Sequence, residues 1–155
     1  MSIKAIPTTY AGCRFRSRLE ARWACFFDAM GWAWDFEPEG YQTKRWYLPD
    51  FRLRHPTGDR WFEVKPYLSA PDAEPEESRW VELSHKSGMP LHVAYGMHRP
   101  GDGCGDPSRP RRHAGRAVLP TGESVLIPTF WTESPYDGAW KAANGARFEH
   151  GESGG

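Results

Sequence analysis

Two short segments of the chain contain residues whose types and spacing are suited to chemistry. The run Tyr47-Leu48-Pro49-Asp50 ends in an acid, and Phe62-Glu63-Val64-Lys65 carries an acid and a lysine two positions apart. Carboxylate oxygens are the ligands that Mg²⁺ prefers, and a lysine beside them places a positive charge next to an attacking water. The pattern therefore predicts metal-dependent hydrolysis of a phosphodiester by Asp50, Glu63 and Lys65.

The chemistry requires that the three side chains meet on one face of a sheet. In a strand over 60–65, Glu63 and Lys65 share one face, while Phe62 lies on the other and can pack under a helix. A four-residue turn over 56–59 would put Asp50 opposite Lys65, on the same face. A register shifted by one residue would put Asp50 on the wrong face. The catalytic interpretation therefore predicts this turn or a β-bulge.

A further acid is expected on the first helix, which the apolar spacing predicts over 15–30 and Gly31 ends. At about 100° per residue, Glu20 falls between Ala24 and Phe27, at the edge of the apolar arc. An acid on the buried side of a helix needs a partner or a metal. We therefore expect Glu20 to reach the same ion as Asp50 and Glu63.

The remaining periodicity predicts the elements that position these residues. Apolar alternation and turn signals give strands over 32–36, 46–54, 60–65 and 91–95, with a helix between about 77 and 86 before the last strand. The expected order over residues 1–100 is αβββαβ. Residues 101–155 are expected to complete the same single domain with an Arg/Gly/Pro-rich loop, a hairpin at 117–127, a short helix at 136–144 and a frayed tail.

Together, the acid and lysine motif, the helix acid and the element order resemble the PD-(D/E)XK, or restriction-endonuclease-like, nuclease superfamily. The runs 10–21 and 37–40, continuing to Lys65, and the tail 146–152 are similar to short hypothetical proteins of actinobacterial phages. The resemblance of the core covers about two thirds of the chain and implies an α/β fold with a mixed central sheet flanked by helices, extended by a C-terminal hairpin and tail.

The resemblance also implies a role for each matching residue. Asp50 and Glu63 would bind one or two Mg²⁺ ions, which Mn²⁺ can replace, and the Val64 carbonyl and Glu20 would be further ligands. Lys65 would orient or activate the hydrolytic water and stabilise negative charge on the phosphate. DNA is the implied substrate, and a homodimer is expected because nucleases of this kind often pair to cut both strands.

The zero net charge, from 20 Lys+Arg and 20 Asp+Glu, means that any DNA contact must come from local clusters of positive charge. Two clusters of arginine and one Lys–Arg pair before the second strand are candidates for neutralising DNA phosphates. The alternative is that these side chains only form a solvated surface. These residues are Arg16, Arg18, Arg22, Lys44, Arg45, Arg109, Arg111 and Arg112.

The three cysteines have no CxxC spacing, which argues against a disulfide framework and favours a reducing compartment. A zinc site built on Cys104 and His113 lacks ligands and compact spacing. No apolar run approaches a membrane span, so the expected location is the cytoplasm of a bacterial host cell, without secretion.

The sequence thus predicts a phage-encoded, Mg²⁺-dependent DNA endonuclease that uses direct water attack. Nicking, resolvase-like and repair- or transposition-type enzymes remain open within this class, as does RNA as substrate. The alternative is a non-catalytic nucleic-acid- or protein-binding module that retains the nuclease fold. Paired carboxylates facing a phosphate would serve no purpose in such a module, which favours the enzyme.

Overall fold

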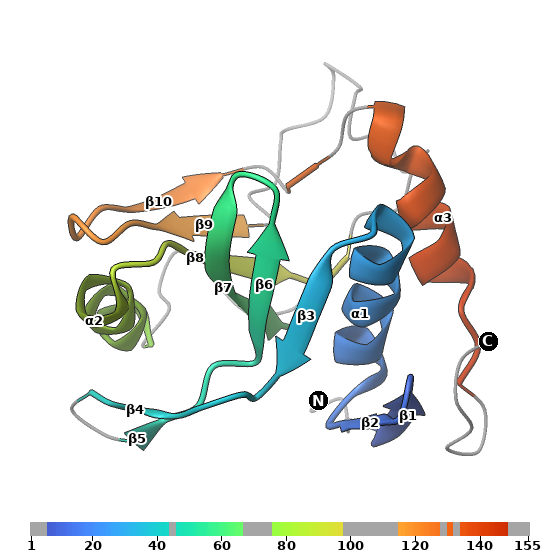
Figure 1. Cartoon of the computed structure of the whole chain (residues 1–155), viewed down its shortest axis with the longest axis horizontal. Helices are drawn as coiled ribbons and strands as arrows, with labels where there is room; N and C mark the ends of the chain where they lie inside the picture. The colour runs from blue at the N-terminus through green and yellow to red at the C-terminus, as the bar shows by residue number, and fades with distance from the viewer. Residues whose placement is uncertain are drawn as a thin grey trace.

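The computed structural model describes residues 6–43, 46–66, 76–97, 115–127, 130–131 and 134–148. Within these ranges the chain forms three α-helices, a mixed six-stranded sheet and two separate two-stranded hairpins (Figure 1). The expected α/β class is confirmed.

Helix α1 (Arg18–Met30) begins three residues later than the apolar spacing predicts. Ser17 is extended and caps the helix, with its hydroxyl oxygen accepting from the Glu20 N–H at 3.2 Å. Gly31, at φ 75°, ends the helix as expected. Phe15, which was expected within the helix, lies instead in a preceding hairpin of β1 (Thr8–Tyr10) and β2 (Cys13–Phe15).

The sheet has the strand order β10-β9-β8-β7-β6-β3. Strands β7 and β8 are parallel and the other neighbours are antiparallel, so α2 makes the crossover between β7 and β8. Along the chain, α1, β3, β6, β7, α2 and β8 follow one another in the αβββαβ order that the sequence predicts. Their bounds are β3 (Ala33–Phe36), β6 (Phe51–His55), β7 (Gly58–Lys65), α2 (Glu77–Ser87) and β8 (Leu91–Tyr95).

The β6–β7 hairpin has a tighter turn than expected. His55 pairs with Gly58, which leaves a two-residue turn in place of the four-residue turn over 56–59. Phe51 pairs with Phe62, so the position before β6, Asp50, falls opposite Glu63 and not opposite Lys65. The expected register was therefore wrong by two residues. Because strand side chains alternate with a period of two, this shift keeps Asp50 on the predicted face.

The single strand expected over 46–54 is two elements. Strand β5 (Trp46–Tyr47) pairs with β4 (Tyr41–Gln42) in a small hairpin outside the main sheet, and β6 begins only at Phe51. Pro49 lies in the interruption and has no N–H to donate to a ladder. The chain therefore bends at the motif, and Asp50 lies immediately before the first residue of β6.

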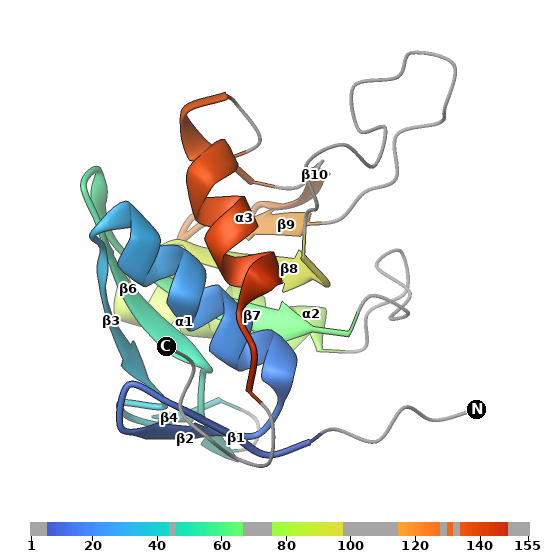
Figure 2. The ribbon, with the colours of Figure 1, turned by 90° about the vertical axis from the view of Figure 1, so that its right-hand side faces the viewer.

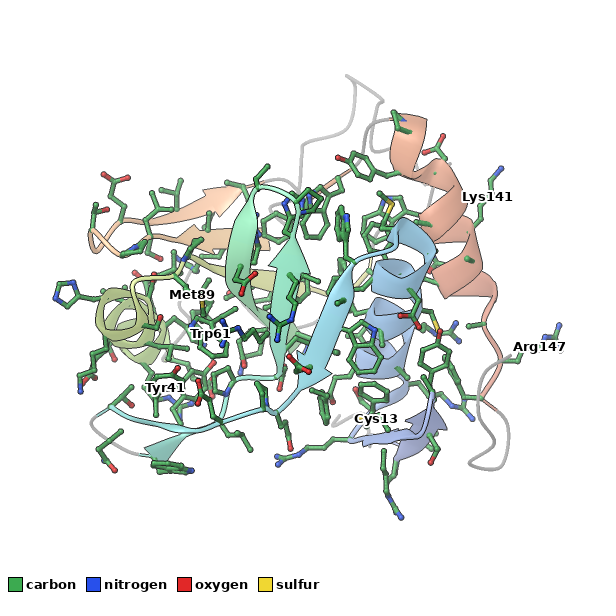
Figure 3. The ribbon with its side chains drawn as sticks, in the orientation of Figure 1. Cys13, Tyr41, Trp61, Met89, Lys141 and Arg147 are labelled. Atoms are coloured by element: carbon green, nitrogen blue, oxygen red, sulfur yellow. The ribbon has the colours of Figure 1, made fainter. Side chains whose placement is uncertain are left out.

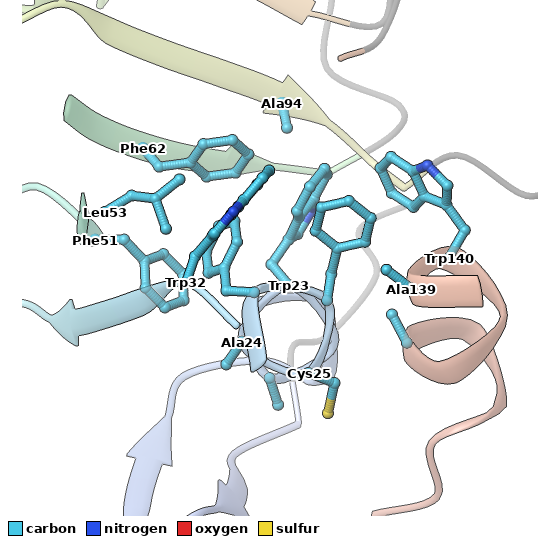
Figure 4. Packing of buried hydrophobic residues seen from close by; sticks show 14 of the residues in the cluster. Trp23, Ala24, Cys25, Trp32, Phe51, Leu53, Phe62, Ala94, Ala139 and Trp140 are labelled. Atoms are coloured by element: carbon cyan, nitrogen blue, oxygen red, sulfur yellow. The ribbon is translucent and has the colours of Figure 1, made fainter. Parts of the chain in front are cut away.

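The two faces of the sheet bury separate cores. Helices α1 and α3 cover one face, where Phe51 and Phe62 join Trp23 and Trp140 in an aromatic cluster (Figures 2 and 4). Helix α2 covers the other face, where Trp61 joins the second cluster. Phe62 thus lies under a helix as expected. By strand alternation, Glu63 and Lys65 belong to the α2 face.

The C-terminal segment extends the same sheet. Strands β9 (Gly115–Val118) and β10 (Ser124–Ile127) form the predicted hairpin, and β9 pairs with β8. The 3₁₀ turn η2 (Ser134–Tyr136) leads into α3 (Asp137–Gly145), which confirms the short helix predicted there. The predicted loop at 98–114 and the tail from 149 lie outside the described residues. Across the described ranges, none of the helices has the length and apolar character needed to cross a membrane.

Candidate functional site

Two hydrogen bonds from backbone N–H groups to carboxylates connect Asp50 with the Glu63–Val64 segment. The Asp50 N–H donates to Glu63 Oε1 at 2.7 Å, and the Val64 N–H donates to Asp50 Oδ2 at 2.9 Å. These bonds continue from the β6–β7 ladder, which ends at the Phe51–Phe62 pair, and fix both carboxylates beside each other. The structure therefore brings together the two acids that the sequence singles out, and Val64, the proposed backbone ligand, lies between them and Lys65.

Burial makes this pair of acids costly to ionise. Glu63 is only 5% exposed. Desolvation raises the pKa of Glu63 to about 7, against the lowering effects of the Asp50 N–H, Tyr47 and Lys65. Desolvation and then the charge of Glu63 raise the pKa of Asp50 well above its usual range. Glu63 therefore takes up a proton near neutral pH, and a cation bound by the pair would take the place of that proton.

Lys65 lies on the same face and forms an ion pair with Glu76 Oε2. Glu76 immediately precedes α2, and its other oxygen accepts from Arg79 Nη2 at 2.8 Å. The Lys65 ammonium also lies 5.7 Å from the ring centroid of Trp80. The first turn of α2 thus holds the lysine. Glu76 was not among the predicted site residues. Acids are common at the start of a helix, and this tendency is the sequence feature that could have indicated it.

Tyr47 is a second residue that the sequence analysis did not select, although it lies in the first motif. It is 5% exposed, and its ring lies under the Arg79 guanidinium at 4.9 Å. Burial, followed by the charge of Glu63, raises the pKa of Tyr47 well above its usual range, so the phenol stays protonated. Tyr47 therefore places a neutral O–H group beside the acid pair.

Glu20 is buried as predicted, with 7% of its surface exposed. Its Oε1 accepts from the Ser17 hydroxyl at 2.8 Å, whereas its Oε2 is buried and has no hydrogen-bond partner among the described residues. Desolvation raises the pKa of Glu20, and the charge of Glu20 contributes to the raised pKa of Asp50. The N-terminus of α1 therefore places a third acid near the pair.

Glu37 adds a further acid at the end of β3. Its backbone is left-handed, at φ 48°, and its N–H donates to the Asp50 carbonyl at 2.6 Å. Its side chain pairs with Arg16, and its charge raises the pKa of Glu20. This strained residue fixes the backbone of Asp50 from the other side, a role that no local sequence pattern indicates.

The donor set suits a hard divalent cation, because all of its side-chain donors are carboxylate oxygens. Asp50 and Glu63 carry raised pKa values, and Glu20 has an unpartnered buried oxygen. In the described part of the chain, however, no three acidic, histidine or cysteine side chains converge closely enough to form a preformed metal cluster. The residues therefore fit a cation held by the Asp50–Glu63 pair, with Glu20 further away.

The predicted DNA-binding residues have different environments. Arg18 is exposed, and Arg16 is exposed while pairing with Glu37 at 2.9 Å. Arg22 instead donates to the carbonyls of Ala143, Asn144 and Ala146, at 2.9–3.0 Å, and so attaches the end of α3 to α1. This contact gives Arg22 a structural role that the sequence did not indicate. Outside the described residues lie Lys44, Arg45, Arg109, Arg111 and Arg112, together with Cys104 and His113 of the rejected zinc site.

Comparison of the chain with protein-family models, curated proteins and solved structures gives no match. The functional argument therefore rests on the residues and their geometry.

Proposed function

We propose that the protein is a Mg²⁺-dependent DNA endonuclease of the PD-(D/E)XK type, encoded by a phage. The observation that carries the proposal is the Asp50–Glu63 pair, in which Glu63 is buried and Asp50 is half-buried, with Lys65 on the same face of the sheet. A structural pair of acids would not need to be brought together in this way at the cost of raised pKa values. The αβββαβ order of the elements supports the same family.

In this proposal Asp50 and Glu63 hold the cation, with the Val64 carbonyl as a further ligand and Glu20 acting through a bound water. The bound cation would supply a Lewis acid that polarises the phosphate and lowers the pKa of a bound water. Lys65, held by Glu76, orients the water and stabilises the negative charge that develops on the phosphate. Tyr47, which stays protonated, lowers the pKa of Glu63 from the protein side.

Hydrolysis proceeds without a covalent enzyme intermediate. The water oxygen forms a new P–O bond, and the water proton passes to solvent or to a carboxylate of the pair. The opposite P–O ester bond breaks, and the leaving oxygen keeps its electron pair and takes up a proton. The backbone bonds at Asp50 and Val64 keep both carboxylates ordered while this occurs.

The direct test is cleavage of supercoiled plasmid and branched DNA in Mg²⁺, Mn²⁺ or EDTA. We expect the wild type to cut in either metal, and Asp50→Ala to lose at least about 100-fold of the rate, the loss typical when a charge-stabilising group is removed. Asp59→Ala is the matched control, because Asp59 lies in the same hairpin but pairs with Arg52 at 3.0 Å. This control should cut like the wild type.

Equal cutting by the wild type and Asp50→Ala would contradict the proposal. DNA binding without any metal-dependent cutting would favour the non-catalytic binding module. The form of the cut, on plasmid or on branches, distinguishes the nicking, resolvase-like and repair- or transposition-type activities.

A further inference from the structure

Trp46 differs from the other tryptophans in its exposure. The chain has eight tryptophans, and the other seven are buried or half-buried. Trp46 is 65% exposed, the largest value among the exposed large hydrophobic residues of the described ranges. An exposed indole presents a flat apolar face on which another ring can stack.

The Trp46 ring is held in a defined place by Gly40. A methyl group on the Gly40 Cα would lie 2.2 Å from Cζ2 and 2.4 Å from Cε2 of Trp46. The indole therefore packs directly against the glycine backbone, at a distance that no other residue type allows. One part of the ring is covered in this way and the rest faces solvent. Such preordering reduces the entropy cost of stacking a ligand on the exposed part.

The hairpin that carries Trp46 is fixed to the body of the protein at several points. The Tyr41 ring packs edge-on against Trp61 at 5.3 Å (Figure 3), and Lys86 Nζ donates to the Gln42 carbonyl at 2.7 Å. On the other strand, Tyr47 is buried beside Glu63 and under Arg79. The two described strands of the β4–β5 hairpin are therefore attached to the body of the protein, with Tyr47 facing the acid pair and Trp46 facing outward.

Trp46 also lies close to the acid pair. Four residues of chain connect it to Asp50, so their Cα atoms are at most about 14 Å apart. At roughly 3.4 Å per nucleotide along a stacked strand, this distance corresponds to no more than about four nucleotides. A nucleic-acid strand held at Asp50 by a phosphate therefore needs only about four further nucleotides to reach the outer face of the β4–β5 hairpin, where the indole lies.

We propose that Trp46 is a stacking platform for an unpaired nucleobase next to the cleaved phosphate, so that the preferred substrate has a single-stranded, flapped or gapped region. The inference rests on the proposed function for its substrate, DNA. Aromatic side chains bind unpaired bases through their π-faces regardless of sequence. Bases inside a duplex are already stacked on their neighbours and offer no free face.

A protein partner fits the surface less well than a flat ligand. The other exposed large hydrophobic residues are Ile6, Leu119 and Val125, which lie on the N-terminal segment and on the β9–β10 hairpin. In Figure 1 the β9–β10 hairpin and the β4–β5 hairpin lie on opposite sides of α2. Among the described residues, Trp46 is therefore separate from the other exposed large hydrophobic side chains, and a stable protein interface needs on the order of 1,000 Å² of buried surface.

The test measures binding in EDTA, without cleavage, to three labelled DNAs of one sequence: a duplex, the same duplex with a single-stranded flap, and the single strand. We expect Trp46→Ala to weaken binding of the flapped and single-stranded DNAs by about 5- to 150-fold, which is the fold-change of losing one stacked base. Duplex binding should change less than about twofold. Leu119→Ala, which removes an exposed apolar residue elsewhere, is the control and should bind all three DNAs like the wild type.

Gly40→Ala provides a second variant that keeps the indole but displaces it. The backbone of Gly40 is not left-handed, so alanine is tolerated there while its methyl group pushes the ring away. We expect a smaller loss in the same direction as for Trp46→Ala, with thermal melting near that of the wild type.

Three results would overturn the inference: equal losses on the duplex and the flapped DNA, unchanged binding in Trp46→Ala, or no DNA binding by the wild type. A change in oligomeric state for Trp46→Ala, with DNA binding unchanged, would assign the ring to contact with a second copy. Plasmid cleavage by Asp50→Ala reports separately on the nuclease. If Asp50→Ala cuts like the wild type but binding of single-stranded DNA still depends on Trp46, the nuclease proposal is wrong and the surface around Trp46 binds single strands without cutting them.

Discussion

At the scale of single residues, the acid pair is a place where the fold holds unfavourable charge. The carboxylates of Asp50 and Glu63 satisfy backbone N–H groups, yet burial raises both pKa values, and the charge of Glu63 raises the pKa of Asp50 further. Between the ordinary pKa values of these acids in the unfolded chain and their raised pKa values in the folded protein, the folded protein therefore binds more protons than the unfolded chain does. The free energy of unfolding accordingly falls as pH rises through this window.

Asp50→Asn tests this cost. At pH 7.5 without metal, the variant loses one buried negative charge and keeps an oxygen that can accept from the Val64 N–H. We expect its melting temperature to rise by about 2–4 °C, which is the shift that about 1 kcal/mol of relieved repulsion and desolvation produces in a domain of this size. In differential scanning fluorimetry, Mg²⁺ should raise the melting temperature of the wild type and leave that of the variant unchanged.

The comparison variant is Asp59→Asn, which removes an acid that forms ion pairs with Arg52 and Arg54. This variant should melt at or slightly below the wild-type temperature. A lower melting temperature for Asp50→Asn than for the wild type would show that the carboxylate is a net stabiliser and not a cost.

At the scale of elements, the start of α2 determines where Lys65 lies. Strand β7 supplies the lysine by alternation, but the ion pair with Glu76 and the ring of Trp80 hold its ammonium group. The charge of Glu76 also raises the pKa of Glu63. Glu76 is therefore a positioning residue that acts on the site through two of its members.

Glu76→Gln should lower the cleavage rate and shift its pH dependence. Without the Glu76 charge the pKa of Glu63 falls, so the acid limb of the pH–rate profile moves to lower pH. Lys65 loses a partner, and we expect kcat to fall about 10-fold or more, within the range for a displaced catalytic group, with KM for DNA little changed.

Glu82→Gln is the matched control. Glu82 lies further along α2 and forms an ion pair at 3.1 Å with Lys86, which is one turn after it. Its profile should overlay that of the wild type. If Glu76→Gln lowers kcat without moving the acid limb, the charge of Glu76 does not reach Glu63.

At the scale of the whole molecule, the sheet separates two hydrophobic cores. A neutral histidine, His92, packs against the aromatic core under α1 and α3. The His92 ring stacks on Phe130, with centroids 4.5 Å apart, and its Nδ1 is buried without a hydrogen-bond partner among the described residues. Burial, followed by the charge of Arg60, lowers the pKa of His92 to about 3. The folded protein therefore keeps this ring uncharged.

The consequence is acid sensitivity of the whole fold. Below the unfolded pKa of about 6.5, the unfolded chain binds a proton at His92 that the folded chain does not bind. The free energy of unfolding therefore falls as pH falls from about 6.5 towards 3. The acid pair acts in the opposite direction over part of this range.

His92→Phe retains the ring and removes the titration. We expect urea unfolding midpoints of this variant to fall less between pH 7 and pH 4.5 than those of the wild type. Parallel curves for the two proteins would mean that His92 is protonated in the folded state and that another group causes the acid sensitivity.

How far the sequence alone predicts the site depends on the range of the interactions. Side-chain alternation within β7 placed Glu63 and Lys65 on one face and Phe62 on the other, because this periodicity is local. The apolar arc of α1 gave the burial of Glu20 for the same reason. The order of helices and strands followed from hydrophobic periodicity and turn residues. The break that Pro49 makes between β5 and β6 was not predicted.

Only the tertiary structure decided which partners these residues meet. The register that sets Asp50 opposite Glu63 depends on a two-residue turn and on pairing across the sheet. Glu76 reaches Lys65 because α2 crosses back over the sheet, and Arg22 leaves the candidate DNA-binding surface because α3 packs on α1. Contacts between residues distant in the chain depend on the packing of whole elements, and no local period encodes them.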